Sequence, residues 1–122
     1  MLVISYTIYM KEILFYKTKN GKCPYTEWLE SLSLEYQFRV QKRINKLKDG
    51  LKGDWKKLQN SKLSELRLDF GKGYRIYYKE LDNIVILIIA GSDKSSQQKT
   101  IKLANTYYEE FIEQYNQRIK SS

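Results

Sequence analysis

The chain has no histidine among its 122 residues. Histidine triads, the usual histidine metal sites and a histidine general base working near pH 7 are therefore excluded. The single cysteine, Cys23, excludes an internal disulfide, and it lies beside Pro24 in an expected loop with no histidine to activate it. This pattern is typical of a cytoplasmic protein. It indicates neither a catalytic thiol, a metal site nor a cofactor.

Long hydrophobic runs are also missing. The opening "MLVISYTIYM" is apolar but too short to span a membrane, and no basic segment precedes it. Two interpretations stay open: residues 1–9 form an extra edge strand, or Met10 is the natural start and residues 1–9 are an extension. With 42% hydrophobic and 30% charged residues, the composition is otherwise typical of one folded domain over residues 1–122.

Acidic residues are few: the chain has 14 aspartate and glutamate residues against 22 lysine and arginine residues, which gives a formal net charge of +8. A small basic domain is a candidate for a polyanionic partner, nucleic acid first, although some basic proteins have no such partner. The segment from residue 39 to residue 62 carries nine basic and two acidic residues, so most of the net charge is concentrated there. Such a run is either a solvated helix face or a surface that contacts phosphates.

The apolar pattern predicts elements in the order β-α-α-β-β-β-α. A strand over residues 12–17 precedes a helical hairpin, in which Pro24 opens the first helix and Ser33 caps the second. Gly50 ends the second helix. The apolar stripe expected on that second helix comprises Leu34, Phe38, Ile44, Leu47 and Leu51, with Gln41 within the same spacing and Val40 beside them.

The second half of the chain predicts three strands and a helix. Strands over residues 63–70 and 73–81 are joined by a glycine-containing turn. The apolar run at residues 84–89 predicts a central strand buried on both faces, and residues 95–118 predict a final helix. Consecutive antiparallel strands with helices grouped elsewhere indicate an α+β fold with a small antiparallel sheet.

The polar face of the hairpin carries Arg67, Arg75 and Tyr77. A three-residue turn sets Asp69 opposite Arg75 and Arg67 opposite Tyr77. Arginine binds phosphate through two parallel hydrogen bonds, and tyrosine hydrogen-bonds a phosphate or stacks on a base. The alternative is an ordinary solvated sheet face on which Asp69 pairs with Arg75.

The loop "AGSDKSS" joins the central strand to the final helix and places Lys94 beside backbone N–H groups that favour anions. Because the central strand lies beside the hairpin in a meander, Lys94 is expected to approach the same polar face. The alternative is a plain helix start, in which Asp93 or Ser95 caps the helix and Lys94 is incidental.

Three segments together resemble the RelE/ParE superfamily of bacterial toxins, in particular its HigB-like addiction-module killer proteins. They are "FYKTKNGKCPYTEWLESL", "LSELRLDFGKGYRIYYK" and "ILIIAGSDKSSQQKTIKLA", and the likeness covers about residues 13–112. The resemblance implies a small antiparallel sheet carrying a helical hairpin and a C-terminal helix. It also implies the toxin of a type II toxin–antitoxin system, a metal-independent endoribonuclease that cuts messenger RNA in the ribosomal A site.

The resemblance also implies roles for individual residues. Arg75 matches the arginine that contacts the scissile phosphate, while Arg67 and Lys94 match further basic positions of the site. Tyr77 is expected to orient the phosphate or a base. The residues expected to contact RNA or the ribosome are Lys42, Arg43, Lys46, Lys56, Lys57 and Lys99.

The proton-transfer groups depart from the family pattern. Several relatives carry a tyrosine or histidine near the last loop, whereas this chain reads "SSQQKT" there and has no tyrosine until Tyr107. Glu65 or Asp69 is the remaining candidate for proton acceptor, although a carboxylate beside arginines is a weak base. Lys94 is a candidate donor to the leaving oxygen.

The implied partners are the ribosome with its messenger RNA and a HigA-like antitoxin carrying a helix-turn-helix. Operator DNA would be bound only through that antitoxin. Two other functions stay open: a ParE-like toxin that poisons gyrase, and a non-catalytic RNA-binding protein. The arginine–lysine set argues against the gyrase poison, which tends to lack it.

Overall fold

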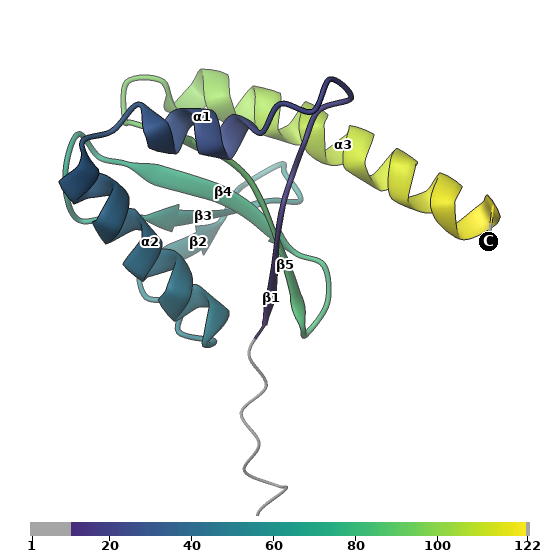
Figure 1. The fold of residues 1–122 in the computed structure, drawn as a ribbon, viewed down its shortest axis with the longest axis horizontal. Helices are drawn as coiled ribbons and strands as arrows, with labels where there is room; N and C mark the ends of the chain where they lie inside the picture. Colours follow the sequence, from purple (N-terminus) through teal and green to yellow (C-terminus); the bar gives the residue numbers. More distant parts are fainter. Residues whose placement is uncertain (1–10, 122) are drawn as a thin grey trace, which may run out of the picture.

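The computed structural model describes residues 11–121 and has an α+β fold with a five-stranded sheet (Figure 1). The expected features of residues 1–9, including the choice of start, lie outside the described residues. The elements are β1 (Glu12–Phe15), α1 (Pro24–Glu30), α2 (Leu34–Lys48), β2 (Trp55–Lys57), β3 (Ser64–Arg67), β4 (Arg75–Glu80), β5 (Val85–Ser92) and α3 (Gln97–Ser121).

The sheet is mixed, which corrects the prediction of a purely antiparallel sheet. Its strand order is β1-β5-β4-β3-β2, and β1 pairs with β5 in parallel while the other neighbours are antiparallel. A parallel pair needs a long crossover connection, and here the helical hairpin and the three intervening strands provide it. Alternation along a strand shows which face is buried but says nothing about its direction relative to a neighbour.

A short edge strand, β2, lies where the sequence indicated only a basic connector. Its three residues, "WKK", pair antiparallel with β3 and are all exposed. Exposed lysines on a short edge strand limit pairing with other chains. Such a strand has no apolar alternation, so the pattern used to find the other strands could not detect it.

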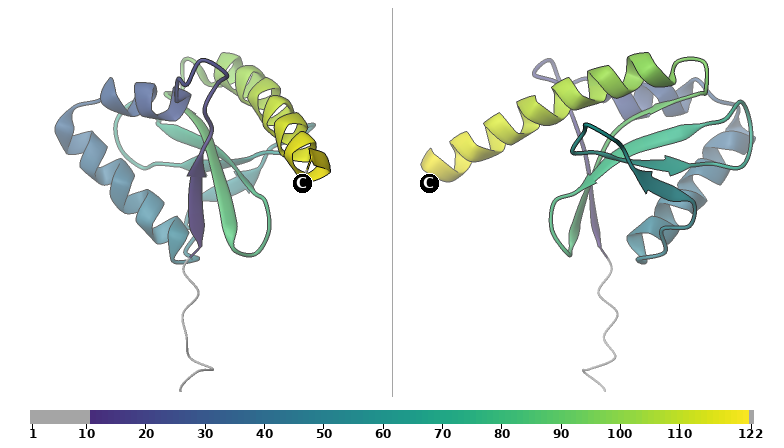
Figure 2. Two further views of the ribbon diagram at one scale, coloured as in Figure 1. Left: turned by 45° about the vertical axis from the view of Figure 1, so that its right-hand side comes forward. Right: turned by 180° about the vertical axis from the view of Figure 1, so that it is seen from behind.

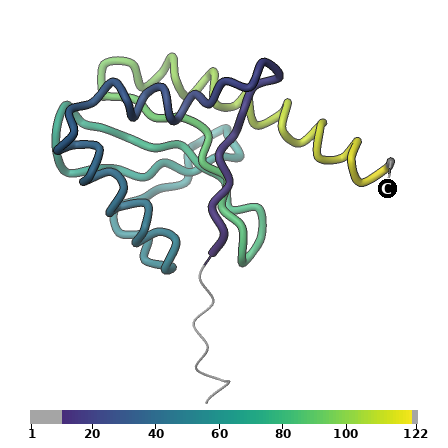
Figure 3. The backbone as a smooth tube through the Cα atoms, in the orientation of Figure 1, coloured from purple at the N-terminus to yellow at the C-terminus, as the bar shows by residue number. Residues whose placement is uncertain are grey.

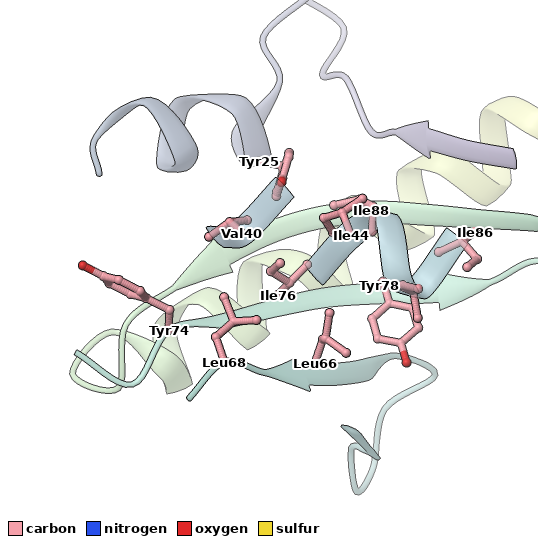
Figure 4. Close-up of a cluster of buried hydrophobic side chains, with 11 residues drawn as sticks. Tyr25, Val40, Ile44, Leu66, Leu68, Tyr74, Ile76, Tyr78, Ile86 and Ile88 are labelled. Carbon is pink, nitrogen blue, oxygen red and sulfur yellow. The ribbon is translucent and has the colours of Figure 1, made fainter. Parts of the chain in front are cut away.

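Helices cover both faces of the sheet. Helices α1 and α2 lie on one face and α3 lies on the other, with its C-terminal part extending past the sheet (Figure 2). Between the helical hairpin and the sheet lies one apolar cluster, in which Ile44 and Val40 of α2 meet Ile76 and Ile88 (Figure 4). Ala104 and Tyr108 of α3 pack in a second cluster, against the opposite face.

The central strand is confirmed. Residues 86 to 89 of β5 are 0% exposed, and they alternate between the two apolar clusters. Ile84 precedes the strand and is 54% exposed, because Asp82 turns the chain there by accepting hydrogen bonds from the N–H groups of Ile84 and Val85. Burial of this strand on both faces makes it the structural centre of the molecule.

Helix α2 has the predicted ends but a different buried stripe. Ser33 accepts a hydrogen bond from the Tyr36 N–H, and Gly50 follows the helix with φ 88°. The prediction was wrong for Leu34, Phe38 and Leu51, which are 74%, 73% and 60% exposed. The buried stripe comprises Val40, Ile44 and Leu47, with Tyr36 packed against it. The helix is therefore rotated about its axis relative to the prediction. In this orientation the Tyr36 ring stacks on Phe70 in the β3–β4 turn.

Within residues 11–121, no helix has both the length and the apolar character needed to cross a bilayer.

Candidate functional site

The β-hairpin formed by β3 and β4 is shifted by two residues from the predicted register. Arg67 lies opposite Arg75, and Glu65 lies opposite Tyr77. The connection is longer than three residues, because β3 ends at Arg67 and β4 begins at Arg75. A shift of two residues keeps every side chain on the same face, so alternation could not distinguish the two registers.

Two glycines make the longer turn possible. Gly71 and Gly73 have φ of 68° and 70°, a region that side chains disfavour. Asp69 consequently lies in the turn, where it is exposed. The predicted pairing of Asp69 with Arg75 is wrong, since the ion pair of Arg75 is made by Glu65.

Lys94 reaches the end of the molecule that carries Arg75. Its backbone N–H donates to the carbonyl of Lys72 at 3.0 Å, so the loop after β5 lies against the β3–β4 turn (Figure 3). A Cβ placed on Gly73 would lie 3.1 Å from the Lys94 Cβ and 3.9 Å from an Nη1 atom of Arg75. The backbone and Cβ of Lys94 therefore lie beside the turn next to Arg75, while the direction of its ammonium group stays a prediction. Asp93 caps the helix start by accepting from the Ser96 N–H.

Glu65 is the common partner of the basic side chains on this face. Its carboxylate lies 2.9 Å from Nε of Arg75, 3.7 Å from Nε of Arg67 and 3.9 Å from Nζ of Lys56. Gln97, from the first turn of α3, donates to Glu65 Oε1 at 2.8 Å. One carboxylate thus joins β2, β3, β4 and α3. We call these five residues the Glu65 cluster.

Exposure rises outward from the carboxylate. Glu65 is 0% exposed, while the side chains of Arg75, Arg67 and Lys56 are 14%, 38% and 49% exposed. Burial removes Glu65 from contact with a ligand, which corrects its assignment as a proton acceptor for RNA. The side chains of Arg75, Arg67 and Lys56 stay partly exposed. The cluster therefore presents positive charge to solvent, while its negative charge is buried beneath.

Tyr77 does not face a ligand, contrary to prediction. It is 0% exposed, and its hydroxyl is 2.8 Å from Oγ of the buried Ser92. The residue belongs to the apolar cluster under α3, because that helix covers the part of the sheet from which Tyr77 projects. Burial raises the pKa of Tyr77 to about 12, and the hydrogen bond with Ser92 offsets part of the rise.

This shift predicts alkaline destabilisation. In the unfolded chain a tyrosine titrates near pH 10, so the stabilisation is complete below about pH 10 and is lost as pH rises toward about 12. The free energy of unfolding is measured by urea titration at pH 8 and at pH 11, for the unmodified chain and for Tyr77→Phe. The decrease from pH 8 to pH 11 should be about 1 kcal/mol smaller for Tyr77→Phe. Equal losses in both proteins would show that the buried phenol does not titrate with folding.

The other expected RNA contacts are spread over two faces. Lys42 and Lys46 are exposed on α2, on the far side of the sheet from α3, whereas Lys99 is exposed on α3. Arg43 is not free for RNA, because its guanidinium donates to the carbonyl oxygens of Leu51 and Lys52. The structure therefore does not unite these residues in one surface, and Arg43 supports the loop after α2.

A groove lies beside the Glu65 cluster. It has a volume of about 490 Å³ between the β2–β3 connection and the start of α3. Its lining residues are Lys56, Lys57, Leu58, Gln59, Asn60, Gln97, Gln98 and Ile101. Two of them, Lys56 and Gln97, also belong to the Glu65 cluster, so the groove adjoins that cluster.

Three site residues were missed from the sequence. Gln97 holds Glu65 from α3, and Ser92 of β5 contacts Tyr77 of the neighbouring strand β4. Both contacts join residues far apart in the sequence, so no local signal indicates them. Lys72 lies in the turn whose backbone contacts Lys94. Its position between two glycines was a signal that this turn brings a cation close to another segment.

The cluster carries polar atoms that are poorly satisfied. Among the described residues, the buried side-chain atoms that make no hydrogen bond include Glu65 Oε2, Arg67 Nε and Arg75 Nε. Their contacts are ion pairs without hydrogen-bond alignment. Buried polar atoms are usually satisfied, and exceptions are frequent at functional sites. No group of three or more potential metal-ligating side chains occurs within residues 11–121.

One comparison identifies a relative. The chain is 37% identical to an uncharacterized protein of Haemophilus influenzae over 87 residues, which are 70% of this chain and 87% of that protein. The chain belongs to the family of that protein. No protein-family model matches the chain. The length of the match shows that most of the Haemophilus protein has a counterpart here.

Proposed function

We propose that the protein is the toxin of a type II toxin–antitoxin system and a ribosome-dependent mRNA interferase of the RelE-like, HigB-like kind. The observation that carries this proposal is the placement of Arg67 directly opposite Arg75, with Lys94 brought to the same end by the loop after β5. Two guanidinium groups on one half-open face, with a lysine in the adjoining loop, suit an RNA phosphate.

The fold supports the same proposal. A helical hairpin, an antiparallel run of strands and a C-terminal helix follow one another along the chain, with β2 as an additional edge strand, and this succession supports the proposed RelE-like fold. We propose that the additional strand is a local extension of this fold, since β3 is its one neighbour among the described strands. The proposed location is the cytoplasm, where ribosomes and messenger RNA are found.

The proposed reaction is attack of a ribose 2′-hydroxyl on the adjacent phosphorus. The 2′ oxygen–phosphorus bond forms, the bond to the 5′ oxygen breaks, and the products are a 2′,3′-cyclic phosphate and a 5′-hydroxyl. Arg75 and Arg67 stabilise the charge that develops on the phosphoryl oxygens, and Lys94 donates a proton to the leaving 5′ oxygen. A ribosomal RNA group in the A site accepts the proton of the 2′-hydroxyl, because Glu65 is buried out of reach of the RNA.

The antitoxin partner is proposed on charge. The +8 chain with an exposed basic face is complementary to an acidic antitoxin segment, which would cover the arginines or block entry into the ribosome. A HigA-like antitoxin with a helix-turn-helix would connect the complex to operator DNA.

A second candidate is a non-catalytic RNA-binding protein. The burial of both Tyr77 and Glu65 favours it, because neither side chain reaches a bound RNA for proton transfer. The basic groove and the arginine pair would still hold an RNA backbone.

An in-vitro translation reaction with mapping of messenger ends separates the candidates. Cuts confined to A-site codons are expected for the interferase. Intact messenger with a supercoiling defect in a parallel gyrase assay indicates a gyrase poison, and intact messenger without such a defect indicates a binding protein. Arg75→Ala serves as the inactive control.

Ribosome binding should depend more on the α3 side of the sheet than on α2. Replacing Lys56, which lies opposite Glu65 on the α3 side, and Lys99 by glutamine should reduce the slope of log affinity against log salt by about 1.4, as expected for two lost phosphate contacts. Replacing Lys42 and Lys46, an equal loss of charge on α2, should change the slope by clearly less. The measurement is a salt series of ribosome-binding titrations. A larger effect of the α2 pair would move the docking face to the helical hairpin.

A further inference from the structure

The strongest unassigned feature of the molecule is a buried carboxylate beneath the basic face. Glu65 projects from β3 toward the α3 side of the sheet and is fully buried, yet it contacts side chains from three other elements. A buried charge is costly unless it is paired. The three cations around Glu65 offset that cost. The negative charge of Glu65 and the positions of these cations therefore depend on each other.

Arg67 and Arg75 need an anion between them. They are directly opposite each other on adjacent strands, and like charges in that position repel. Glu65 lies within ion-pair distance of both guanidinium groups, one on each carboxylate oxygen. Its charge therefore permits two arginines to occupy neighbouring positions in the absence of RNA.

The contacts also fix which atoms of Arg75 are offered to a ligand. Nε faces Glu65 at 2.9 Å, and Nη1 donates to the Gly73 carbonyl at 3.3 Å. A guanidinium carries five N–H donors, so Nη2 and the second hydrogen of Nη1 stay available for a phosphate. Gln97 holds the same carboxylate oxygen from α3 and prevents Glu65 from following the arginine outward.

Counting the charges supports a role in the reaction. Three cations of the cluster surround one carboxylate, which leaves two positive charges uncompensated. An RNA phosphodiester carries one negative charge, and a second develops on it when the deprotonated 2′ oxygen attacks. The cluster is therefore complementary in charge to the transition state, as electrostatic catalysis requires.

We propose that Glu65 is the positioning residue of the phosphate site: its buried carboxylate orients Arg75 and Arg67 so that their outer nitrogens meet the scissile phosphate. Glu65 does not itself touch RNA. The inference rests on the proposed function, because its kinetic effect is measured as messenger cleavage, and it adds a residue that acts only through the arginines.

The kinetic test compares two conservative variants. Glu65→Asp keeps the charge and Glu65→Gln keeps the shape, so positioning by charge predicts that the aspartate variant is the more active. For Glu65→Gln we expect kcat about 100-fold lower with KM for programmed ribosomes within about twofold, as for a misplaced catalytic group. Glu80→Gln removes a carboxylate that pairs with Lys52 at 3.0 Å and is the matched control, with both constants unchanged.

Thermal melts accompany each variant. If Glu65→Gln does not fold, Gln97→Ala takes its place, since it removes the amide that holds the carboxylate and leaves the ion pairs. Its kcat should fall about tenfold with KM unchanged. A folded Glu65→Gln or Gln97→Ala variant with normal kcat, or a glutamine variant at least as active as the aspartate variant, overturns the proposal.

A spectroscopic measurement separates this inference from the proposed function. In ¹⁵N spectra the Nε–H signal of Arg75, assigned with Arg75→Lys, should shift in Glu65→Gln and stay in place in Glu80→Gln. A shift in a protein that cuts no messenger would retain the positioning role and reject the interferase. An unmoved signal would reject the positioning role, whatever the cleavage result.

Discussion

Replacing Arg75 by alanine should lower messenger cleavage about 10²- to 10³-fold while the protein stays folded. Arg75 is held by Glu65 and the Gly73 carbonyl, faces Arg67 across the strand pair, and lies beside the loop that carries Lys94. No other side chain within residues 11–121 combines these positions, so its loss removes the centre of the proposed phosphate site. Cleavage rates in the translation reaction and growth arrest on induction measure the effect.

Arg39→Ala is the matched control for this variant. Arg39 is an exposed arginine on α2 that stacks on the Phe70 ring at 4.3 Å, and its loss removes the same charge from the opposite side of the sheet. We expect its cleavage rate to stay near that of the unmodified chain. Undiminished cleavage by a folded Arg75→Ala protein would show that the site is elsewhere.

Replacing Ile88 by alanine should cost about 2 to 5 kcal/mol of unfolding free energy. Ile88 is 0% exposed at the centre of β5. It belongs, with Ile44, to the apolar cluster between the helical hairpin and the sheet. Small domains are stable by only about 5 to 15 kcal/mol, so the change is a large fraction of the total. Urea unfolding followed by circular dichroism measures it.

Ile84→Ala removes the same atoms four residues earlier. Ile84 is 54% exposed and precedes β5, so we expect a loss of about 1 kcal/mol or less. Comparable losses for the two variants would contradict the assignment of β5 as the buried centre of the sheet.

Burial pattern and local signals predicted much of the fold. The run of β-branched residues in β5, the Ser33 cap of α2 and the glycine after that helix all occur where the sequence places them. Each depends on residues close in the chain. The direction of β1, the existence of β2 and the rotation of α2 depend on distant partners, and the sequence pattern carries no information about those.

The candidate site was predicted in composition but not in arrangement. Arg67, Arg75 and Lys94 are brought to one region, whereas Tyr77 is buried beneath α3 and Asp69 lies in the turn. Alternation identified the residues of the polar face, but it could not show that α3 covers part of that face. The same covering helix supplies Gln97, which turns Glu65 from an apparent surface carboxylate into the buried partner of three cations.

The most direct test of the proposed function is the chemistry of messenger ends produced in a purified translation reaction. The proposed reaction predicts cuts within the A-site codon that carry a 2′,3′-cyclic phosphate and a 5′-hydroxyl, formed by the unmodified chain and by Arg39→Ala but not by Arg75→Ala. Messenger that stays intact with the folded, ribosome-bound protein, or cuts that persist with Arg75→Ala, would contradict it.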